Sequence, residues 1–165
     1  MKAYLLIPAV VLFISCNYKA KDKENSKETT TDPGTEKSVS VVDGCYMKIT
    51  GRDTVILMLE QIGDELTGKM LFDNYQKDGS RGSVSGKVEG EIVKIWYDFF
   101  AEGIHSVMEI NFKNENEKLV RGIGDIDVKG DTAYYKDPAG IGYSESETFT
   151  KTGCALLQGK MNFTK

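Results

Sequence analysis

Residues 91–113 (EIVKIWYDFFAEGIHSVMEINFK) constrain the fold more than any other part of the sequence. Two runs rich in β-branched and aromatic residues flank the turn signal Ala101-Glu102-Gly103. In each run apolar side chains alternate with polar ones, and this period of two is that of a half-buried β-strand rather than a helix. The stretch therefore predicts two long antiparallel strands joined by a tight turn.

The same pattern of strand, turn and strand continues through residues 41–154, where turn signals recur about every dozen residues. Glycine is abundant, with 17 residues, and proline is rare, with 3. We therefore predict an all-β domain over residues 41–154, an antiparallel up-and-down meander of about eight or nine strands. Closure hides the sheet edges, so a small lipocalin-like β-barrel is favoured, and an open β-sandwich is the alternative.

The alternation also assigns side chains to faces. In residues 92–100 it places Tyr97 and Phe99 on the face of Val93 and Ile95, and Trp96 on the opposite face. A dense aromatic group can line a ligand pocket or form a protein-binding patch. Ordinary core packing is the commoner role for Tyr97, so Trp96 is the better candidate for an exposed contact.

Arg121 is a candidate binding residue whose direction the sequence leaves open. In one register Leu119, Arg121 and Ile123 face inward, and a buried guanidinium then needs a carboxylate partner or an anionic ligand. In the other register Val120 and Gly122 face inward and Arg121 lies in water, the commoner place for an arginine. Both registers are compatible with the pattern.

The sequence offers little that suggests catalysis or metal binding. His105 and Glu109 share one strand face, but apolar residues occupy the opposite face, so both are expected to point to solvent and a hydrolase is the weakest hypothesis. The aspartates of residues 125–137 lack the ligand order of an EF-hand loop and are interpreted as turn and surface residues. We predict no enzyme activity, metal or cofactor. The net charge of −4 and the lack of a basic patch argue against nucleic acid as a partner.

Residues 1–15 are interpreted as a signal peptide, with Lys2 before an apolar run. The run LFISC that ends at Cys16 resembles the lipobox of bacterial lipoproteins, although Phe13 departs from the more usual leucine. That resemblance implies a lipidated Cys16 as the mature N-terminus. Residues 16–40 are charged and almost without apolar side chains, which is typical of a solvated, disordered tether.

Three cysteines in an exported chain need an explanation. If Cys16 carries lipid, Cys45 and Cys154 remain, near the start and the end of the predicted domain. We predict that they form a disulfide joining the first and last strands, and two free buried thiols are the alternative. Residues 155–165 form a short C-terminal tail to which the sequence assigns no role.

Several short motifs together resemble a family of small lipoproteins from Bacteroidetes-type bacteria. The motifs are Cys45-Tyr46, Gly51-Arg52-Asp53-Thr54-Val55, Lys77-Asp78, Tyr97-Asp98-Phe99-Phe100-Ala101-Glu102-Gly103, Ser106 and Glu109. The resemblance spans most of residues 44–154 and implies an outer-membrane address and this fold, but no reaction. The expected function is a non-enzymatic binding module for a small ligand or a protein partner. The alternative is a structural or envelope-stress accessory protein that acts through surface contacts.

Overall fold

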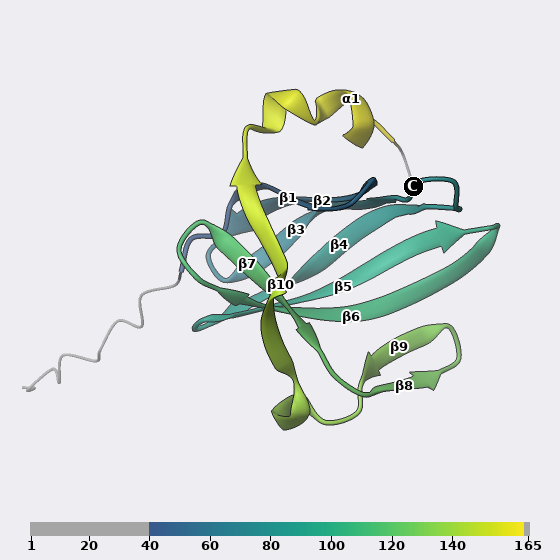
Figure 1. The fold of residues 1–165 in the computed structure, drawn as a ribbon. Helices are drawn as coiled ribbons and strands as arrows, with labels where there is room; N and C mark the ends of the chain where they lie inside the picture. Colours follow the sequence, from purple (N-terminus) through teal and green to yellow (C-terminus); the bar gives the residue numbers. More distant parts are fainter. Residues whose placement is uncertain (1–39, 164–165) are drawn as a thin grey trace, which may run out of the picture. The chain divides into compact units, whose positions relative to one another are not determined.

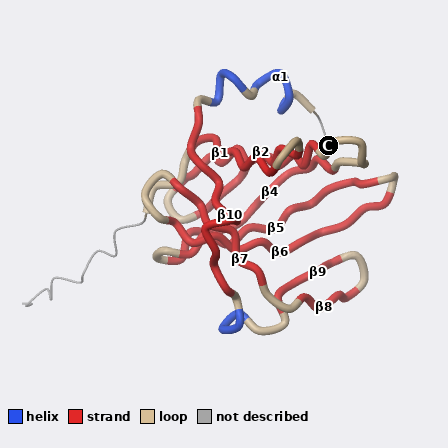
Figure 2. Tube along the Cα trace, in the orientation of Figure 1, coloured by secondary structure: helices blue, strands red, loops and turns tan. Residues whose placement is uncertain are grey.

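The computed structural model describes residues 40–163 and contains ten strands (Figures 1 and 2). The predicted signal peptide, the lipid site at Cys16 and nearly all of the predicted tether lie outside the described residues. The strands are β1 (Gly44–Thr50), β2 (Asp53–Ile62), β3 (Glu65–Asp73), β4 (Ser80–Glu89), β5 (Ile92–Ala101), β6 (Ile104–Asn114), β7 (Lys118–Ile123), β8 (Ile126–Lys129), β9 (Thr132–Tyr135) and β10 (Gly142–Thr152). Two short 3-10 helices, η1 (Pro138–Gly140) and η2 (Cys154–Leu156), and one helical turn, α1 (Gln158–Met161), complete the elements.

Eight of the strands close a β-barrel, as the turn spacing predicted. β1 to β7 pair in chain order and antiparallel, and β10 pairs with both β7 and β1. Closure in this up-and-down order is the lipocalin-like arrangement, so the alternative of an open sandwich does not apply. The remaining two strands, β8 and β9, form a hairpin outside the closed ring.

β6 changes its pairing partner part-way along its length. Its second half pairs with β7, where Phe112 lies opposite Arg121, whereas its first half pairs in parallel with β9 at Val107 and Met108. β7 ends at Ile123, and the next strand, β8, begins at Ile126 outside the barrel wall. The β8–β9 hairpin occupies the place beside β6 that β7 has vacated (Figure 1).

The barrel interior is filled by the alternating side chains that the sequence assigned to one face. Leu57 and Leu59 of β2 and Val93, Ile95 and Tyr97 of β5 all belong to the interior core. They pack with apolar residues of the other barrel strands and with Phe149 of β10. The interior is therefore a packed core along most of its length, which supplies the hydrophobic driving force for folding.

The two ends of the barrel differ. At one end, called here the closed end, the chain arrives at Ser40, whose hydroxyl donates to the Gly90 carbonyl at 3.1 Å. Val42 follows, is fully buried and accepts a 3.1 Å hydrogen bond from Tyr46 through its carbonyl. The opposite end, called here the open end, carries the connections β1–β2, β3–β4 and β5–β6. Residue 40 therefore lies at the closed end, beside the β4–β5 connection, and the barrel strands begin from there.

Glycines allow β3 and β4 to lie very close to their neighbouring strands. A Cβ atom at Gly68 would lie 1.9 Å from the Met58 carbonyl oxygen, and one at Gly82 would lie 1.9 Å from that of Asp98. No side chain fits at such distances without moving the neighbouring backbone. The close approach of these strands is therefore restricted to glycine.

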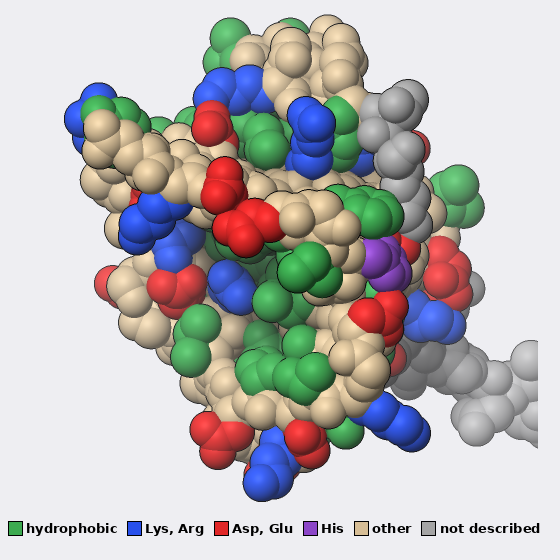
Figure 3. Space-filling model, turned by 90° about the vertical axis from the view of Figure 1, so that its right-hand side faces the viewer, with side chains coloured by type: hydrophobic (Ala, Val, Ile, Leu, Met, Phe, Trp, Pro, Cys, Tyr) green, Lys and Arg blue, Asp and Glu red, His purple; other side chains and the backbone are tan. Residues whose placement is uncertain are grey.

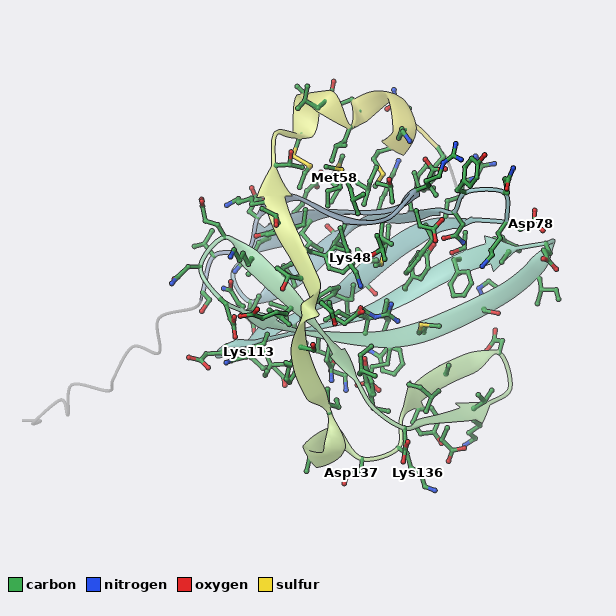
Figure 4. The ribbon with its side chains drawn as sticks, viewed as in Figure 1. Lys48, Met58, Asp78, Lys113, Lys136 and Asp137 are labelled. Carbon is green, nitrogen blue, oxygen red and sulfur yellow. A yellow bond between two sulfur atoms is a disulfide. The ribbon has the colours of Figure 1, made fainter. Side chains whose placement is uncertain are left out.

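A second apolar cluster lies outside the barrel, over the outer faces of β1, β2 and β3. Leu157 and Met161 of the C-terminal segment pack there against Ile56 and Met58. Figure 4 shows Met58 on the side of β2 that faces α1. The C-terminal tail, to which the sequence assigned no role, thus covers one wall of the barrel.

The predicted disulfide is present at the base of this outer cluster. Cys45 of β1 is bonded to Cys154 of η2, with the two Cα atoms 5.2 Å apart and 109 positions apart in sequence. The alternative of two free thiols is therefore wrong. The bond anchors the C-terminal segment to the first strand.

Candidate functional site

The best candidate site is a cavity at the open end of the barrel, of about 260 Å³. Strands β3, β4, β5, β6 and β7 and the β3–β4 connection contribute its walls. Its lining consists of Phe72, Asn74, Asp78, Gly79, Ser80, Tyr97, Phe99, Ala101, Met108 and Arg121. Figure 3 looks toward the right-hand side of Figure 1, where hydrophobic side chains form a band down a hollowed face with charged groups on both sides. An apolar hollow with few polar groups is typical of ligand sites.

Three aromatic rings form one wall of this cavity. Tyr97 and Phe99 are stacked, with ring centroids 4.5 Å apart, and the Phe72 ring is tilted against Tyr97 at 5.7 Å. The Tyr97 hydroxyl donates to the Ser80 hydroxyl oxygen at 3.0 Å. Tyr97 is a core residue, as its strand face predicted, and it is also part of the cavity wall.

Arg121 points into the barrel. This result selects the inward register, with Leu119 in the interior core and Arg121 beside it on the same face of β7. The guanidinium approaches the Met108 sulfur at 3.9 Å and lies over the Phe72 ring, 6.0 Å from its centroid. The Arg121 Nε atom is buried and has no hydrogen-bond partner among residues 40–163.

The charge of Arg121 is not neutralised by a neighbouring carboxylate. Within the described part of the chain, no carboxylate oxygen lies within 4.0 Å of its nitrogens. Lys48, the interior lysine of β1, is different, because Glu147 pairs with it at 2.6 Å. Figure 4 shows Lys48 between the walls of the barrel. Of these two inward cations, Arg121 is the one without an acidic partner among residues 40–163, and its side chain is partly buried with a fully buried Nε atom.

Two buried tyrosines next to the cavity keep their protons at neutral pH. Burial raises the pKa of Tyr97 to about 12, and the hydrogen bond to Ser80 opposes this only in part. Burial also raises the pKa of Tyr135, although the positive charge of Arg121 counteracts the rise. The Tyr135 hydroxyl donates to the Gly122 carbonyl at 2.7 Å. Neither phenol therefore adds negative charge beside Arg121.

Trp96 lies on the outer face of β5, as its strand position predicted, and is half-buried. Its ring is 5.5 Å from the Lys94 ammonium group. Trp96 borders a shallow outer groove of about 380 Å³ together with Glu65, Ser85 and Lys87. The three candidate binding residues therefore do not form one site, because Tyr97 and Arg121 share the cavity and Trp96 lies outside the barrel.

His105 and Glu109 do not come together as a catalytic pair. His105 is exposed, as predicted, and both of its ring nitrogens are bound, by Asp98 and Asp131, each at 2.9 Å. These contacts raise the pKa of His105, the hydrogen bond to Asp98 most and the one to Asp131 next, with burial opposing the rise.

The prediction that Glu109 faces solvent is wrong, because its side chain is only 5 % exposed. Glu109 accepts hydrogen bonds from the Lys94 ammonium group at 2.7 Å and from the Tyr135 backbone N–H at 3.1 Å. Its strand face was assigned correctly to the outside of the barrel. The β8–β9 hairpin, which ends at Tyr135, covers that face, so Glu109 is a structural residue.

A larger groove, of about 610 Å³, runs over the outer faces of β3, β4 and β5 near the open end. Both signs of charge line it, including Lys69 and Arg81 as well as Asp73 and Asp98. Lys69 is occupied there by the carbonyl of Phe163, at 2.7 Å. The charges of this groove thus lie among opposite charges, so the interior cavity with its unpaired cation is the stronger candidate.

Sequence reasoning missed several residues of the cavity. Phe72 and Met108 lie in the apolar alternation of their strands, but nothing in the local sequence indicates that they stand at the open end of the barrel. The remaining wall comes from the β3–β4 connection, where only the turn signal at residues 77–79 was visible.

Comparisons with models of protein families, with curated proteins and with solved structures find no match to this chain. Among residues 40–163, no helix has the length and apolar character needed to cross a bilayer. These residues also contain no group of three or more His, Cys, Asp or Glu side chains arranged to hold a metal ion.

Proposed function

We propose that this protein is a lipid-anchored binding module of the bacterial cell envelope that holds a small ligand in the open end of its barrel. The observation that supports ligand binding most directly is the cavity of about 260 Å³ with an aromatic wall and the inward-facing Arg121. Packed side chains fill the barrel below this cavity. The ligand is therefore a small molecule, or the end of a larger one, and not a long chain threaded through the barrel.

Two features of the chain support the envelope address. The run that ends at Cys16 resembles a lipobox, and two or three acyl chains on one cysteine suffice for stable attachment to a bilayer. The Cys45–Cys154 disulfide is of the kind that persists in oxidising compartments such as the periplasm. The proposal places the barrel at the outer membrane and includes no catalytic step.

The proposed site is tested by filling it. Ala101 lines the cavity, and Ala101→Trp adds a bulky ring there, whereas Thr150→Trp adds the same ring at an exposed position of β10. The chain from residue 16, with Cys16→Ser to remove the lipid, is titrated with benzyl alcohol and followed by ¹⁵N-resolved NMR.

We expect saturable shifts at cavity residues in the parent chain and in Thr150→Trp, and their loss in Ala101→Trp. Equal shifts in all three chains, or none in the parent chain, would contradict a ligand site at the open end.

A second candidate function is a surface-contact role in the envelope, supported by Trp96. A half-buried tryptophan bordered by both signs of charge is a common anchor of protein interfaces. Pull-down from native membranes separates the two functions. A partner retained by the parent chain and by Ala101→Trp but lost by Trp96→Ala supports the surface role, and a partner retained by all three chains contradicts it.

A further inference from the structure

We propose that the ligand of the open-end cavity is a monoanion, namely a small carboxylic acid with a flat or short apolar body, and that Arg121 binds its carboxylate. This inference rests on the proposed function and adds the chemical class of the ligand. It follows from the charges, the hydrogen-bonding capacity and the size of the cavity.

The Arg121 guanidinium, rather than the net charge of the cavity, favours an anion. Arg121 is held among Met108, Phe72 and the Tyr135 region, and no carboxylate of residues 40–163 reaches it. Its Nε atom is buried without a partner. A guanidinium loses hydration when it is buried and regains the lost interactions best from a planar, two-oxygen acceptor, which a carboxylate provides. An anionic ligand would supply the acidic partner that residues 40–163 do not, beside the contacts of Arg121 with Met108 and Tyr135.

The rest of the lining indicates a single negative charge. Among residues 40–163, Arg121 is the one cation that lines the cavity, and Asp78 of the β3–β4 connection also lines it. In Figure 4, Asp78 lies at the right-hand end of the molecule. A ligand with two negative charges, such as an organic phosphate at neutral pH, would leave one charge without a counter-ion and would face repulsion from Asp78. The cavity therefore favours a carboxylate over a phosphate.

The apolar part of the ligand is limited by the walls. Stacked Tyr97 and Phe99 present a flat aromatic surface, and Met108 adapts to irregular shapes. A volume of about 260 Å³ is at the small end for ligand pockets and accommodates a single ring or a short acyl chain. Phenylacetate has these properties, and it is used below as a probe rather than as the natural ligand.

The test compares three molecules with one ring and different charges: phenylacetate, the neutral phenylacetamide and phenyl phosphate. Dissociation constants are measured by NMR titration at about pH 7.5 on the chain from residue 16 with Cys16→Ser. Each titration is repeated in Arg121→Met and in Arg121→Lys, which retains the charge but not the planar fork. Lys87→Met is the matched control, because it removes one positive charge from the exposed outer face of β4.

We expect phenylacetate to bind roughly tenfold or more tightly than phenylacetamide, and more tightly than phenyl phosphate. Arg121→Met is expected to abolish the preference for the acid over the amide, Arg121→Lys to reduce it, and Lys87→Met to leave it unchanged. Spectra of the unliganded variants establish that each is folded. If Arg121→Met does not fold, the comparison of Arg121→Lys with Lys87→Met decides the test.

Different results would contradict the existence of the ligand site and the preference of that site for a monoanion. Equal binding of acid and amide in the parent chain, with both lost in Ala101→Trp, would overturn the monoanion inference and leave the ligand site standing. A preference for the acid that survives in every folded Arg121 variant would also overturn it. Binding of none of the three molecules would overturn the proposed site itself.

Discussion

Removing the Cys45–Cys154 bond is expected to destabilise the barrel by several kcal/mol without changing its fold. The bond closes a loop between residues 109 positions apart. In the chain-entropy model a loop of this length constrains the unfolded state by about 4.8 kcal/mol, and native disulfides of small domains contribute roughly 2–5 kcal/mol in practice. The double variant Cys45→Ala/Cys154→Ala is therefore expected to lose about 2–5 kcal/mol of unfolding free energy.

Urea unfolding at equilibrium measures this loss. With an m-value of about 2 kcal/mol/M, the midpoint is expected to fall by roughly 1 to 2.5 M. The oxidised parent chain and the parent chain in reductant are the two references, and the reduced parent should match the double variant. A loss below about 1 kcal/mol would refute the argument from loop length.

A second comparison separates two explanations for the loss. Leu157 is 6 % exposed in the outer cluster, and Leu157→Ala is expected to cost about 2–5 kcal/mol. If the disulfide acts on the unfolded chain, this cost persists in the reduced protein and the two effects add. If it acts by holding the C-terminal segment on the barrel, Leu157→Ala should cost almost nothing after reduction. That result would contradict the unfolded-state explanation.

Three further predictions concern other residues. The pKa of His105 is raised in the folded state above its usual value of 6.5, so its stabilising contribution is complete below about pH 6.5 and is lost as pH rises through the folded pKa. The melting temperatures of the parent chain and of His105→Ala should therefore converge at alkaline pH. A difference between the two that stays constant with pH would contradict this. Glu109→Ala removes the hydrogen-bond acceptor of the Lys94 ammonium group and of the Tyr135 N–H, and because Lys94 is partly exposed it should cost about 1–3 kcal/mol in urea unfolding, with exposed Glu145→Ala as control. Gly68→Ala forces a Cβ atom against the Met58 carbonyl and should lower the urea midpoint clearly, whereas Gly153→Ala, where the added atom meets open space, should not.

The parts of the fold that depend on local pattern could be predicted from the sequence. The alternation in residues 92–100 placed Val93, Ile95 and Tyr97 inside the barrel and Trp96 outside, and the structure agrees. The disulfide was predicted from the number of cysteines together with the expectation that the chain is exported. These features depend on the period of a strand and on composition, which a single sequence displays directly.

The parts that depend on distant contacts could not be predicted. Glu109 is buried because β9, some twenty residues later in the chain, pairs in parallel with β6. The sequence around Glu109 contains no pattern that predicts this pairing. The inward register of Arg121 is fixed by its pairing opposite Phe112 and by the departure of β7 from the wall. For the C-terminal tail a signal existed, because Leu157 and Met161 are spaced by four residues, as on one face of a helical turn.

The entry of the chain at the closed end also determines how the barrel bears a mechanical load. A pull on the chain ahead of Ser40 reaches β1, which is hydrogen-bonded along both edges, to β2 and to β10. To unfold, β1 must break its hydrogen bonds to both neighbouring strands at the same time. At Cys45 the force is also transmitted through the Cys45–Cys154 disulfide to the C-terminal segment. The open-end cavity lies at the other end of the barrel, outside this load path. A barrel pulled from the end where the chain enters at Ser40 would therefore keep its cavity intact until the first strand yields.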